Sequence, residues 1–558
     1  MSFKFIELSS ELILNKEIKD DNINVIYQFY IPNDSERYKE IKECLLHNVN
    51  NEFINNIYLL NEKEYSIQEL GGIHSDKIKQ VVINKRLTFS ETFNLINEHN
   101  ISGYNVIINS DIFLDNTINN IKYSDIKNKK ICLTQLRHNY ESGRPLNTAR
   151  LFGPRFDSQD AWIMHSNFNI PKSECYLFNF LFGTPGCDNK LVYLFKILGY
   201  HIVNDPLTIK IYHLHKEMFR NYNLKPIEPP WGMISAAKIS ITKHISTLGI
   251  DVRTAYNHTN GYRSFSFTND NIILGKYIFN KLSRNENFII PRIGGIENNY
   301  ALIGNNINCV TRKNIKDYLN KTLKVMKKNA GIQLINTNSI RAYSQLYLDA
   351  FKNCDIYTGW EPWGDVYSGI KNSHNEIRKT FPDKKIIWAF SLDIFHYIRS
   401  MPWTFTLKGK RILIISPFAD SMREKDNIRE KMYGVDLFPE CSITYIKPPQ
   451  TQGDEPSQVF IHELESFYVK LDAISNSYDV ALVSAGGYGN LICNHIYITG
   501  HSAIYIGGVL QMYFGIFGER WLRERSDILR LYLNEHWTRP KHEEKPINYE
   551  NVENSCYW

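Results

Sequence analysis

The stretch Tyr104–Asp115, Y-N-V-I-I-N-S-D-I-F-L-D, decides the fold of the first half of the chain. Its apolar run ends abruptly at Asn109-Ser-Asp111, a pattern typical of a buried strand in an α/β sheet. Ligands of such sheets bind at the carboxyl ends of the strands, where Asp111 would lie. A carboxylate in that place can hold a divalent cation, and through it a diphosphate. Taken alone, an aspartate that caps the next turn is the simpler interpretation.

Strands and helices alternate before this stretch. Strands are predicted at Ile23–Tyr30, Ile57–Leu60 and Val81–Ile83, and helices at Ser35–Val49 and Thr88–Asn97. Together with the strand at Tyr104 they give the order β-α-β-β-α-β. That order predicts a mostly parallel sheet with crossover helices, and therefore an α/β fold.

Three later features are candidates to meet the end of that strand. The polar stretch 137–156 contains four arginines, and a loop of that length is more often functional than decorative. Asp188 lies at or near the start of a helix predicted at Lys190–Leu198. His213 and His215 alternate along an extended segment, so only one of them can face inward. For each residue alone, helix capping by Asp188 and a surface or satisfied histidine are the simpler explanations.

These motifs, taken in order, resemble those of an inverting GT-A glycosyltransferase over about residues 22–224. In that family a D-x-D-type motif holds Mn²⁺ or Mg²⁺ and the diphosphate of a nucleotide sugar, and an E-D pair at a late helix supplies the catalytic base. In this chain Cys187 stands in place of the Glu and Asn109 in place of the first Asp. The resemblance implies donor binding by Asn109, Asp111 and Arg86, metal binding by Asp111 with His213 or His215, and catalysis by Asp188.

The second half of the chain also reads as strands followed by helices. Strands are predicted at Phe288–Pro291, Ile412–Ser416, Tyr478–Ser484 and Ser502–Ile506, most of them ending in glycine-containing or Asp/Ser turns. This pattern predicts a Rossmann-like sheet whose helix N-termini can cradle phosphates. The turn Gly486–Gly489 is not a G-x-G-x-x-G motif, which argues against nicotinamide binding, and ordinary strand–helix turns explain the same residues.

The motif Arg292-Ile-Gly-Gly-Ile-Glu297, with the turns that follow the later strands, resembles the GT-D-type glycosyltransferases over about residues 270–530. That family carries R-F-G-D-G-E, whose D-x-E grips the metal and the nucleotide sugar. Glu297 matches the Glu, and Gly295 stands where the family has the Asp. The resemblance implies a catalytic role for Glu297 and donor binding by Gly295, Asp420, Gly486, Gly487 and Tyr488.

The chain of 558 residues is too long for one core, and the stiff segment Pro226–Pro230 marks a change of composition. We therefore predict two Rossmann-like nucleotide-sugar-binding domains: a GT-A-like domain at 1–230, a linker at 231–265, and a GT-D-like domain at 266–558.

Composition excludes several other classes of protein. The nine cysteines are scattered without a C-x-x-C pair, which disfavours a disulfide framework and a structural zinc site. The net charge of +6 is spread along the chain without a basic block, so nucleic acid is not the favoured partner. No apolar run is long enough to span a bilayer, and acids appear too early for a signal peptide, so a soluble cytoplasmic protein is expected.

We interpret the chain as a bifunctional glycosyltransferase that uses UDP- or GDP-linked sugar donors and a glycan acceptor, with a homodimer left open. The first alternative is one active domain with a degenerate second domain that binds glycan or serves a structural role. A nucleotidyltransferase is disfavoured, because Tyr27–Pro32 lacks the glycine-rich loop with arginine and lysine that such an enzyme needs.

Overall fold

The computed structural model describes residues 11–153, 155–214, 224–228, 230–239, 250–255, 262–266, 269–305, 323–359 and 373–558. Their contacts divide the chain into two compact units, Ile6–Asn269 and Asp270–Trp558, each described here by itself. In the described residues no helix combines the length and apolar character needed to cross a membrane.

The N-terminal unit is built on a seven-stranded sheet in the order β10-β6-β9-β4-β1-β2-β3. All neighbouring strands are parallel except β9, which runs antiparallel to both β4 and β6, so the prediction of a mostly parallel sheet is confirmed. The strands are β1 (Ile23–Tyr27), β2 (Asn56–Asn61), β3 (Ile78–Val82), β4 (Tyr104–Ile108), β6 (Ile131–Gln135), β9 (Ala161–His165) and β10 (His201–Val203).

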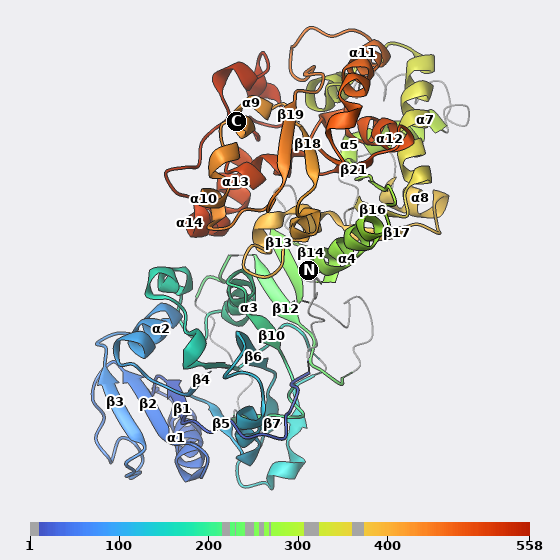
Figure 1. The fold of residues 1–558 in the computed structure, drawn as a ribbon. Helices are drawn as coiled ribbons and strands as arrows, with labels where there is room; N and C mark the ends of the chain where they lie inside the picture. The colour runs from blue at the N-terminus through green and yellow to red at the C-terminus, as the bar shows by residue number, and fades with distance from the viewer. Residues whose placement is uncertain are drawn as a thin grey trace, which may run out of the picture. The chain divides into compact units, whose positions relative to one another are not determined.

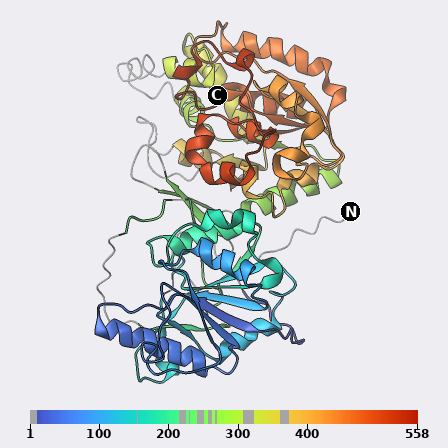
Figure 2. The ribbon, with the colours of Figure 1, turned by 90° about the vertical axis from the view of Figure 1, so that its left-hand side faces the viewer.

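Three helices cover the two faces of this sheet, as Figure 2 shows. They are α1 (Ser35–Asn50), α2 (Phe89–Glu98) and α3 (Cys187–Ile197). Helix α1 packs its buried Ile41 and Leu45 on the face that carries Val25 and Val106. On the other face the ring of Phe89 in α2 meets Trp162 of β9. Helices α1 and α2 begin within one residue of their predicted starts, because Asp34 caps α1 and Thr88 forms a capping box with Glu91 in α2. Helix α3 begins three residues before the predicted start at Lys190.

A second, four-stranded sheet lies beside the end of β4. Its order is β5-β11-β7-β8, and its strands are β5 (Ile112–Leu114), β7 (His138–Tyr140), β8 (Arg150–Leu151) and β11 (Ile211–Leu214). Strand β11 runs antiparallel to β5, with His213 opposite Ile112. This pairing brings the late histidine next to the Asn-Ser-Asp segment, which is separated from it by about a hundred residues in the chain.

The stretch 231–265 differs from the predicted linker. It contains β12 (Trp231–Ile234), β13 (Ile250–Ala255) and β14 (Tyr262–Ser266), which form an antiparallel sheet in that order. Gly232 allows β12 to lie against α3, because a Cβ atom at this position would collide with the backbone of Tyr193. The proline-rich segment before Trp231 is therefore followed by ordered strands, and the first unit extends beyond residue 230.

The C-terminal unit contains a fully parallel sheet in the order β15-β21-β20-β18-β19. The strands are β15 (Ile289–Ile290), β18 (Arg411–Ile415), β19 (Ser442–Ile446), β20 (Val480–Val483) and β21 (Ser502–Tyr505), so all four strands predicted in this half are present. Strand β18 pairs with β19 on one side and with β20 on the other. The chain thus reverses its direction of travel across the sheet between β18 and β20, and ligands of open α/β sheets bind at such a point.

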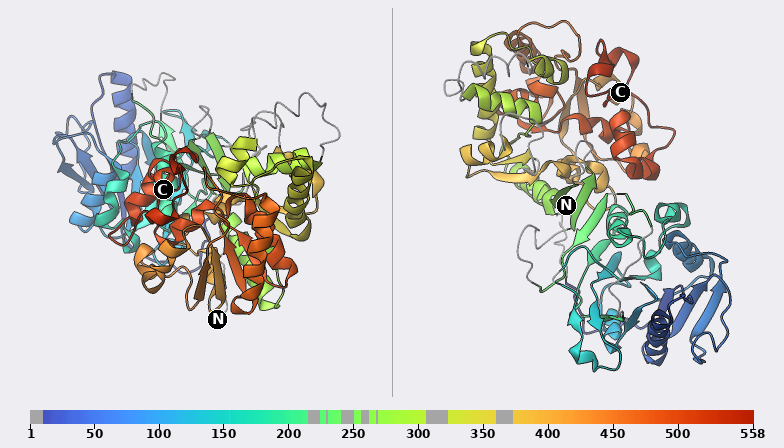
Figure 3. Two further views of the ribbon diagram at one scale, coloured as in Figure 1. Left: turned by 90° about the horizontal axis from the view of Figure 1, so that it is seen from above. Right: turned by 180° about the vertical axis from the view of Figure 1, so that it is seen from behind.

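Helices cover both faces of this sheet (Figures 1 and 3). Leu413, Val483 and Ala503 face the larger core cluster, to which α5, α7, α11 and α12 contribute. The helices of the unit are α4 (Asn269–Ser283), α5 (Gly295–Asn305), α7 (Thr337–Asn353), α8 (Ser373–Thr380), α9 (Ala419–Arg423), α10 (Glu430–Tyr433), α11 (Phe460–Ala473), α12 (Gly489–Ile498), α13 (Glu519–Glu524) and α14 (Ser526–Tyr532). A two-stranded sheet, β16 (Ile356–Gly359) with β17 (Lys385–Trp388), completes it.

Candidate functional sites

In the N-terminal unit, several polar side chains meet at the carboxyl end of β4. Asn109 follows this strand directly, and its Nδ2 donates a hydrogen bond to Oδ1 of Asp160 at 3.2 Å. Asp160 stands just before β9, which is antiparallel to β4, so the start of β9 lies at the same edge as the end of β4. The amide of the neighbouring Gln159 donates to Oδ2 of Asp188 at 3.3 Å. The predicted residues Asn109 and Asp188 therefore belong to one group, linked by Asp160.

Asp188 lies in the first turn of α3, where the sequence places it, and is half-buried. Its carboxylate accepts hydrogen bonds from the backbone amides of Asn189 and Gln159. Burial, together with the negative charge of Asp160, outweighs these two bonds and raises the pKa of Asp188 to about 7. A carboxyl group with that pKa can accept a proton from a hydroxyl near neutral pH.

Asp160 is held by an arginine from the long polar loop. Nη1 of Arg137 lies 2.7 Å from Oδ2 of Asp160, and the two residues are only 4% and 8% exposed. The guanidinium groups of Arg137 and Arg155 both stack on the ring of Phe152, and Arg155 also binds Asp157 through two hydrogen bonds. The loop was predicted to be functional, but the sequence did not indicate which arginine reaches the strand end.

Asp111 is the centre of a second group two residues further along. Nε2 of His213 lies 3.0 Å from Oδ2 of Asp111, as the resemblance implies for one of the two histidines. Nη2 of Arg37, from α1, lies 2.6 Å from the same oxygen, and this contact was not predicted. Burial opposes ionisation of Asp111, but His213 and Arg37 together hold its pKa well below the ordinary value.

The residues around Asp111 do not fit the expected Mn²⁺ or Mg²⁺. Arg37 and His213 both contact Oδ2 of Asp111, and the positive charge of Arg37 at 2.6 Å would repel a cation bound to this carboxylate. Among the residues that the structure describes, no three His, Cys, Asp or Glu side chains form a group able to hold a metal ion. His215 lies outside the described residues. Arg86 is exposed and donates to the carbonyl oxygen of Phe182, so the structure does not bring it into either group.

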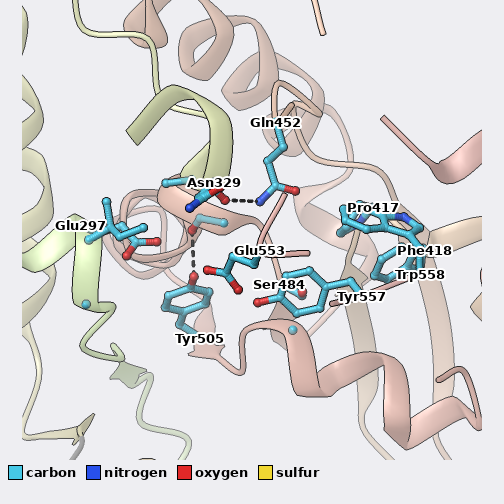
Figure 4. A pocket seen from close by; sticks show the side chains of 15 residues that line it. Glu297, Asn329, Pro417, Phe418, Gln452, Ser484, Tyr505, Glu553, Tyr557 and Trp558 are labelled. Carbon is cyan, nitrogen blue, oxygen red and sulfur yellow. Dashed lines mark hydrogen bonds between the residues drawn. The ribbon is translucent and has the colours of Figure 1, made fainter. Parts of the chain in front are cut away.

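The C-terminal unit has a pocket of about 120 Å³ at the carboxyl ends of its central strands (Figure 4). It lies where the chain reverses across the sheet, since Pro417 follows β18 and Ser484 follows β20. Of the residues predicted in this half, Gly295, Glu297 and Gly486 line it.

The other three predicted residues of this half do not line the pocket. Gly487 lies against Ile332, and Tyr488 is buried with its hydroxyl near Thr451. Asp420 is bound by Lys447 and Arg423, which lower the pKa of its carboxyl group, with Lys447 the larger influence. In this structure Gly487 and Tyr488 are therefore part of the core, and Asp420 belongs to a surface ion-pair group.

Glu297 lies in the first turn of α5, and its carboxyl group folds back over the start of that helix. A Cβ atom on Gly294 would collide with Oε2 of Glu297, so a side chain at this position would have to displace the carboxyl group. Burial raises the pKa of Glu297; the negative charge of Glu553 adds to the increase, while its own backbone amide and Arg292 oppose it. Two carboxyl groups thus influence each other in one pocket.

Residues 553–558 supply the lining that the sequence did not predict. Glu553, Tyr557 and Trp558 all line the pocket. Arg520 forms an ion pair with Glu553 and a 3.1 Å hydrogen bond with the hydroxyl of Tyr557. Nη1 of Arg539 donates to the carbonyl oxygen of Trp558 at 2.7 Å. In the sequence, the aromatic pair Tyr557-Trp558 could have drawn attention to this segment, but it does not indicate which part of the chain the segment contacts.

No protein-family model matches the chain, and no curated protein sequence matches it. Among solved structures, a mannosyltransferase from Pyrobaculum calidifontis in complex with GDP-Man and Mn²⁺ matches at 12% identity and a TM-score of 0.25, over 38% of this chain and 61% of that chain. A glycosyltransferase (DUF1792) from Streptococcus sanguinis matches at 10% identity and a TM-score of 0.26, over 49% of this chain and 94% of that one. A putative glucose-1-phosphate thymidylyltransferase from Bacillus anthracis matches at 10% identity and a TM-score of 0.22. Likeness at this level decides neither family nor activity, so the side chains of the two sites have to carry any assignment.

Proposed function

We propose that this protein is a glycosyltransferase whose N-terminal unit transfers a sugar from a UDP- or GDP-linked donor to a glycan acceptor. The observation that carries the proposal is the half-buried carboxyl group of Asp188, which has a pKa of about 7 and lies at the ligand-binding edge of the sheet.

The chemistry of transfer needs a base at this place. An acceptor hydroxyl is a weak nucleophile until its proton is removed, and a carboxylate within hydrogen-bond reach can remove it. As the acceptor oxygen bonds to the anomeric carbon, the bond from that carbon to the diphosphate breaks, and the sugar passes through an oxocarbenium-like state. In this mechanism Asp188 takes the proton of the hydroxyl and stabilises the positive sugar centre.

The departing diphosphate also needs positive charge. Arg137 and Arg37 lie in the same region and are fixed by Asp160 and Asp111, so their guanidinium groups are already oriented. We assign charge stabilisation to these arginines, because the residues around Asp111 do not fit a metal ion. Activity that persists in excess EDTA is the expected result, and full loss that Mn²⁺ restores would contradict this part of the proposal.

Two buried polar atoms beside Asp188 support a ligand at this site. Among the described residues, Oε1 of Gln159 and Nδ2 of Asn189 find no hydrogen-bond partner, although the two residues are only 2% and 7% exposed. Buried polar groups are normally paired, so each of these atoms is a candidate contact for a bound hydroxyl or water molecule.

The test is the variant Asp188→Asn, assayed with a panel of UDP- and GDP-sugars. Transfer and donor hydrolysis should fall at least about 100-fold, whereas donor affinity should change less than about threefold, because the amide has the same shape but cannot accept the proton. Asp125→Asn is the control, since Asp125 is bound by Lys19 and Lys129 and takes no part in the site. Equal turnover by the Asp188→Asn variant and the parent would remove Asp188 from this role.

A second transfer activity remains a proposal for the C-terminal unit, with Glu297 as its base. It is supported by the position of Glu297 in a pocket at the carboxyl ends of parallel strands. Donor turnover that survives in Asp188→Asn and disappears in the double variant with Glu297→Gln would establish it.

A further inference from the structure

The pocket of the C-terminal unit differs in its chemistry from a site for a free phosphate. Among the residues that the structure describes, its lining contains Glu297 and Glu553 but no lysine, arginine or histidine. Figure 4 shows Glu553 between the rings of Tyr505 and Tyr557, with the carboxyl group of Glu297 directed toward the same space. Arg520 holds Glu553 from outside the lining. Arg292 also acts on Glu297 without belonging to that lining. A diphosphate without a cation would therefore meet two carboxylates, and no basic side chain, in the described lining itself.

A side chain of the protein already occupies the helix N-terminus in this pocket. The first backbone amides of a helix attract anions, and α5 begins at Gly295 in the pocket wall. The carboxyl group of Glu297 lies over that helix start and is held close to Gly294, where any side chain would displace it. The favourable position for a phosphate is therefore taken by a group of the same charge.

The remaining lining fits the hydroxyl groups and the apolar faces of a sugar. Glu297, Glu553 and the buried, unpartnered Oδ1 of Asn329 can accept hydrogen bonds from hydroxyl groups. The rings of Tyr557 and Trp558 lie 5.9 Å apart, edge to face, and form one wall together with Phe418. Aromatic rings bury the C–H face of a sugar, while carboxylates orient its hydroxyl groups.

We propose that this pocket binds an uncharged sugar residue of a glycan, and that Glu553, Tyr557 and Trp558 determine its specificity. This site goes beyond the transfer reaction of the N-terminal unit and does not depend on it. The C-terminal unit would then hold the glycan. A domain without a second transfer activity would contribute to the transfer reaction in this way.

The experiment measures binding to the full chain by calorimetry and by tryptophan fluorescence. The probes are neutral disaccharides of glucose, galactose, mannose and N-acetylglucosamine, and, separately, UDP and GDP with and without Mn²⁺. We expect millimolar or tighter binding of at least one neutral disaccharide, weakened about tenfold or more in both Glu553→Gln and Glu297→Gln. Because Glu553→Gln also removes the Arg520 ion pair, Glu297→Gln provides an independent variant on the opposite wall. The exposed Glu550→Gln is the matched control.

Two results would overturn the proposal. One is that no disaccharide binds, or that one binds equally well to both variants. The other is that UDP or GDP binds only with Mn²⁺ and loses this binding in the two glutamate variants, which would make the pair a metal site for a nucleotide. The same measurements on Asp188→Asn separate the two proposals, since sugar binding should persist in that variant even if the assignment of the transfer reaction fails.

Discussion

The candidate sites of the two units both lie at the carboxyl ends of parallel strands, but they differ in the charges around their carboxylates. In the N-terminal unit Asp111 and Asp160 each bind an arginine within 2.7 Å. In the C-terminal pocket the part of the lining that the structure describes includes two glutamates and no basic side chain. The position of a site in the sheet therefore indicates where a ligand binds, whereas the side chains of the surrounding loops determine the charge of the site.

The two candidate bases share the cause of their raised pKa. Burial is the largest influence on both Asp188 and Glu297, and a neighbouring carboxylate, Asp160 or Glu553, adds to it. The difference lies in the surroundings, because the neighbour of Asp188 is bound by Arg137 inside the site, whereas Arg520 binds Glu553 from outside the pocket lining. Among the described residues, an arginine that could stabilise a departing diphosphate therefore belongs to the first site and not to the lining of the second.

The largest expected effect comes from removing an arginine of the N-terminal site. Arg137→Ala should lower the free energy of unfolding by about 3–5 kcal/mol, because it leaves the buried carboxylate of Asp160 without its partner. Urea unfolding of the full chain measures this loss. Adding Asp160→Asn to the variant should recover part of the stability, since the uncompensated charge is then gone. A double variant no more stable than Arg137→Ala would show that the ion pair is not the cause.

The next largest effect is the pH dependence of transfer, which tests the influence of Asp160 on Asp188. A base with a pKa of about 7 is mostly protonated at pH 6 and mostly ionised at pH 8, so kcat/KM should rise about tenfold over that range. Asp160→Asn should move this rise to lower pH, because it removes a negative charge that disfavours ionisation of Asp188. An unchanged profile in this variant would mean that another group is titrating.

A smaller effect concerns stability and pH. The pKa of Asp188 rises on folding from 3.8 to about 7, so the stabilising contribution of its neutral form is complete below about pH 4 and is lost as the pH rises through 7. The neutral amide of Asp188→Asn avoids that loss, and its melting temperature relative to the parent should increase by several degrees between pH 4 and pH 8.

Asp111 should respond to pH in the opposite direction. Its folded-state pKa lies well below 3.8, so its stabilising contribution is present above that value and is lost as the pH falls. Asp111→Asn should therefore be less stable than the parent at pH 7, with the difference shrinking in acid. Differential scanning calorimetry of both variants across this range checks the two signs together.

The smallest effect probes residues 553–558. A Cβ atom on Gly518 would collide with the backbone of Tyr557, so Gly518→Ala should shift this segment without affecting the sheet. We expect the affinity for the neutral disaccharide to fall about threefold to tenfold, with transfer by the N-terminal unit unchanged. Titration calorimetry and the transfer assay, run on the same preparation, measure both.

Much of this arrangement follows from local pattern. The end of β4 before Asn109, a helix start near Asp188 and the inward position of one histidine all depend on periodicity over a few residues. In the structure β4 ends at Ile108, α3 starts at Cys187, and His213 contacts Asp111, while His215 lies outside the described residues. The parallel order of the strands in each half was predictable for the same reason.

The part of the arrangement that the sequence did not predict consists of contacts between distant segments. Arg37 reaches Asp111 from the first helix, Arg137 reaches Asp160 across a loop, and Glu553 joins Glu297 from the last described segment. No pattern of spacing relates these residues, because their proximity depends on how the helices and loops pack. The strand β12 within the stretch predicted as a linker was missed for a similar reason: it is held by its packing against α3, which a proline-rich stretch does not reveal.

The wall formed by residues 553–558 has a consequence for how the C-terminal unit folds. Its contacts with the start of α5 join parts of the chain that are more than two hundred positions apart, and contacts of such high order form slowly. The central sheet makes a contact of similar order, because β15 pairs with β21, so the sheet and the cavity both depend on bringing these distant segments together. A molecule that recognises the finished cavity would bind only mature protein and would protect it against unfolding by mass action.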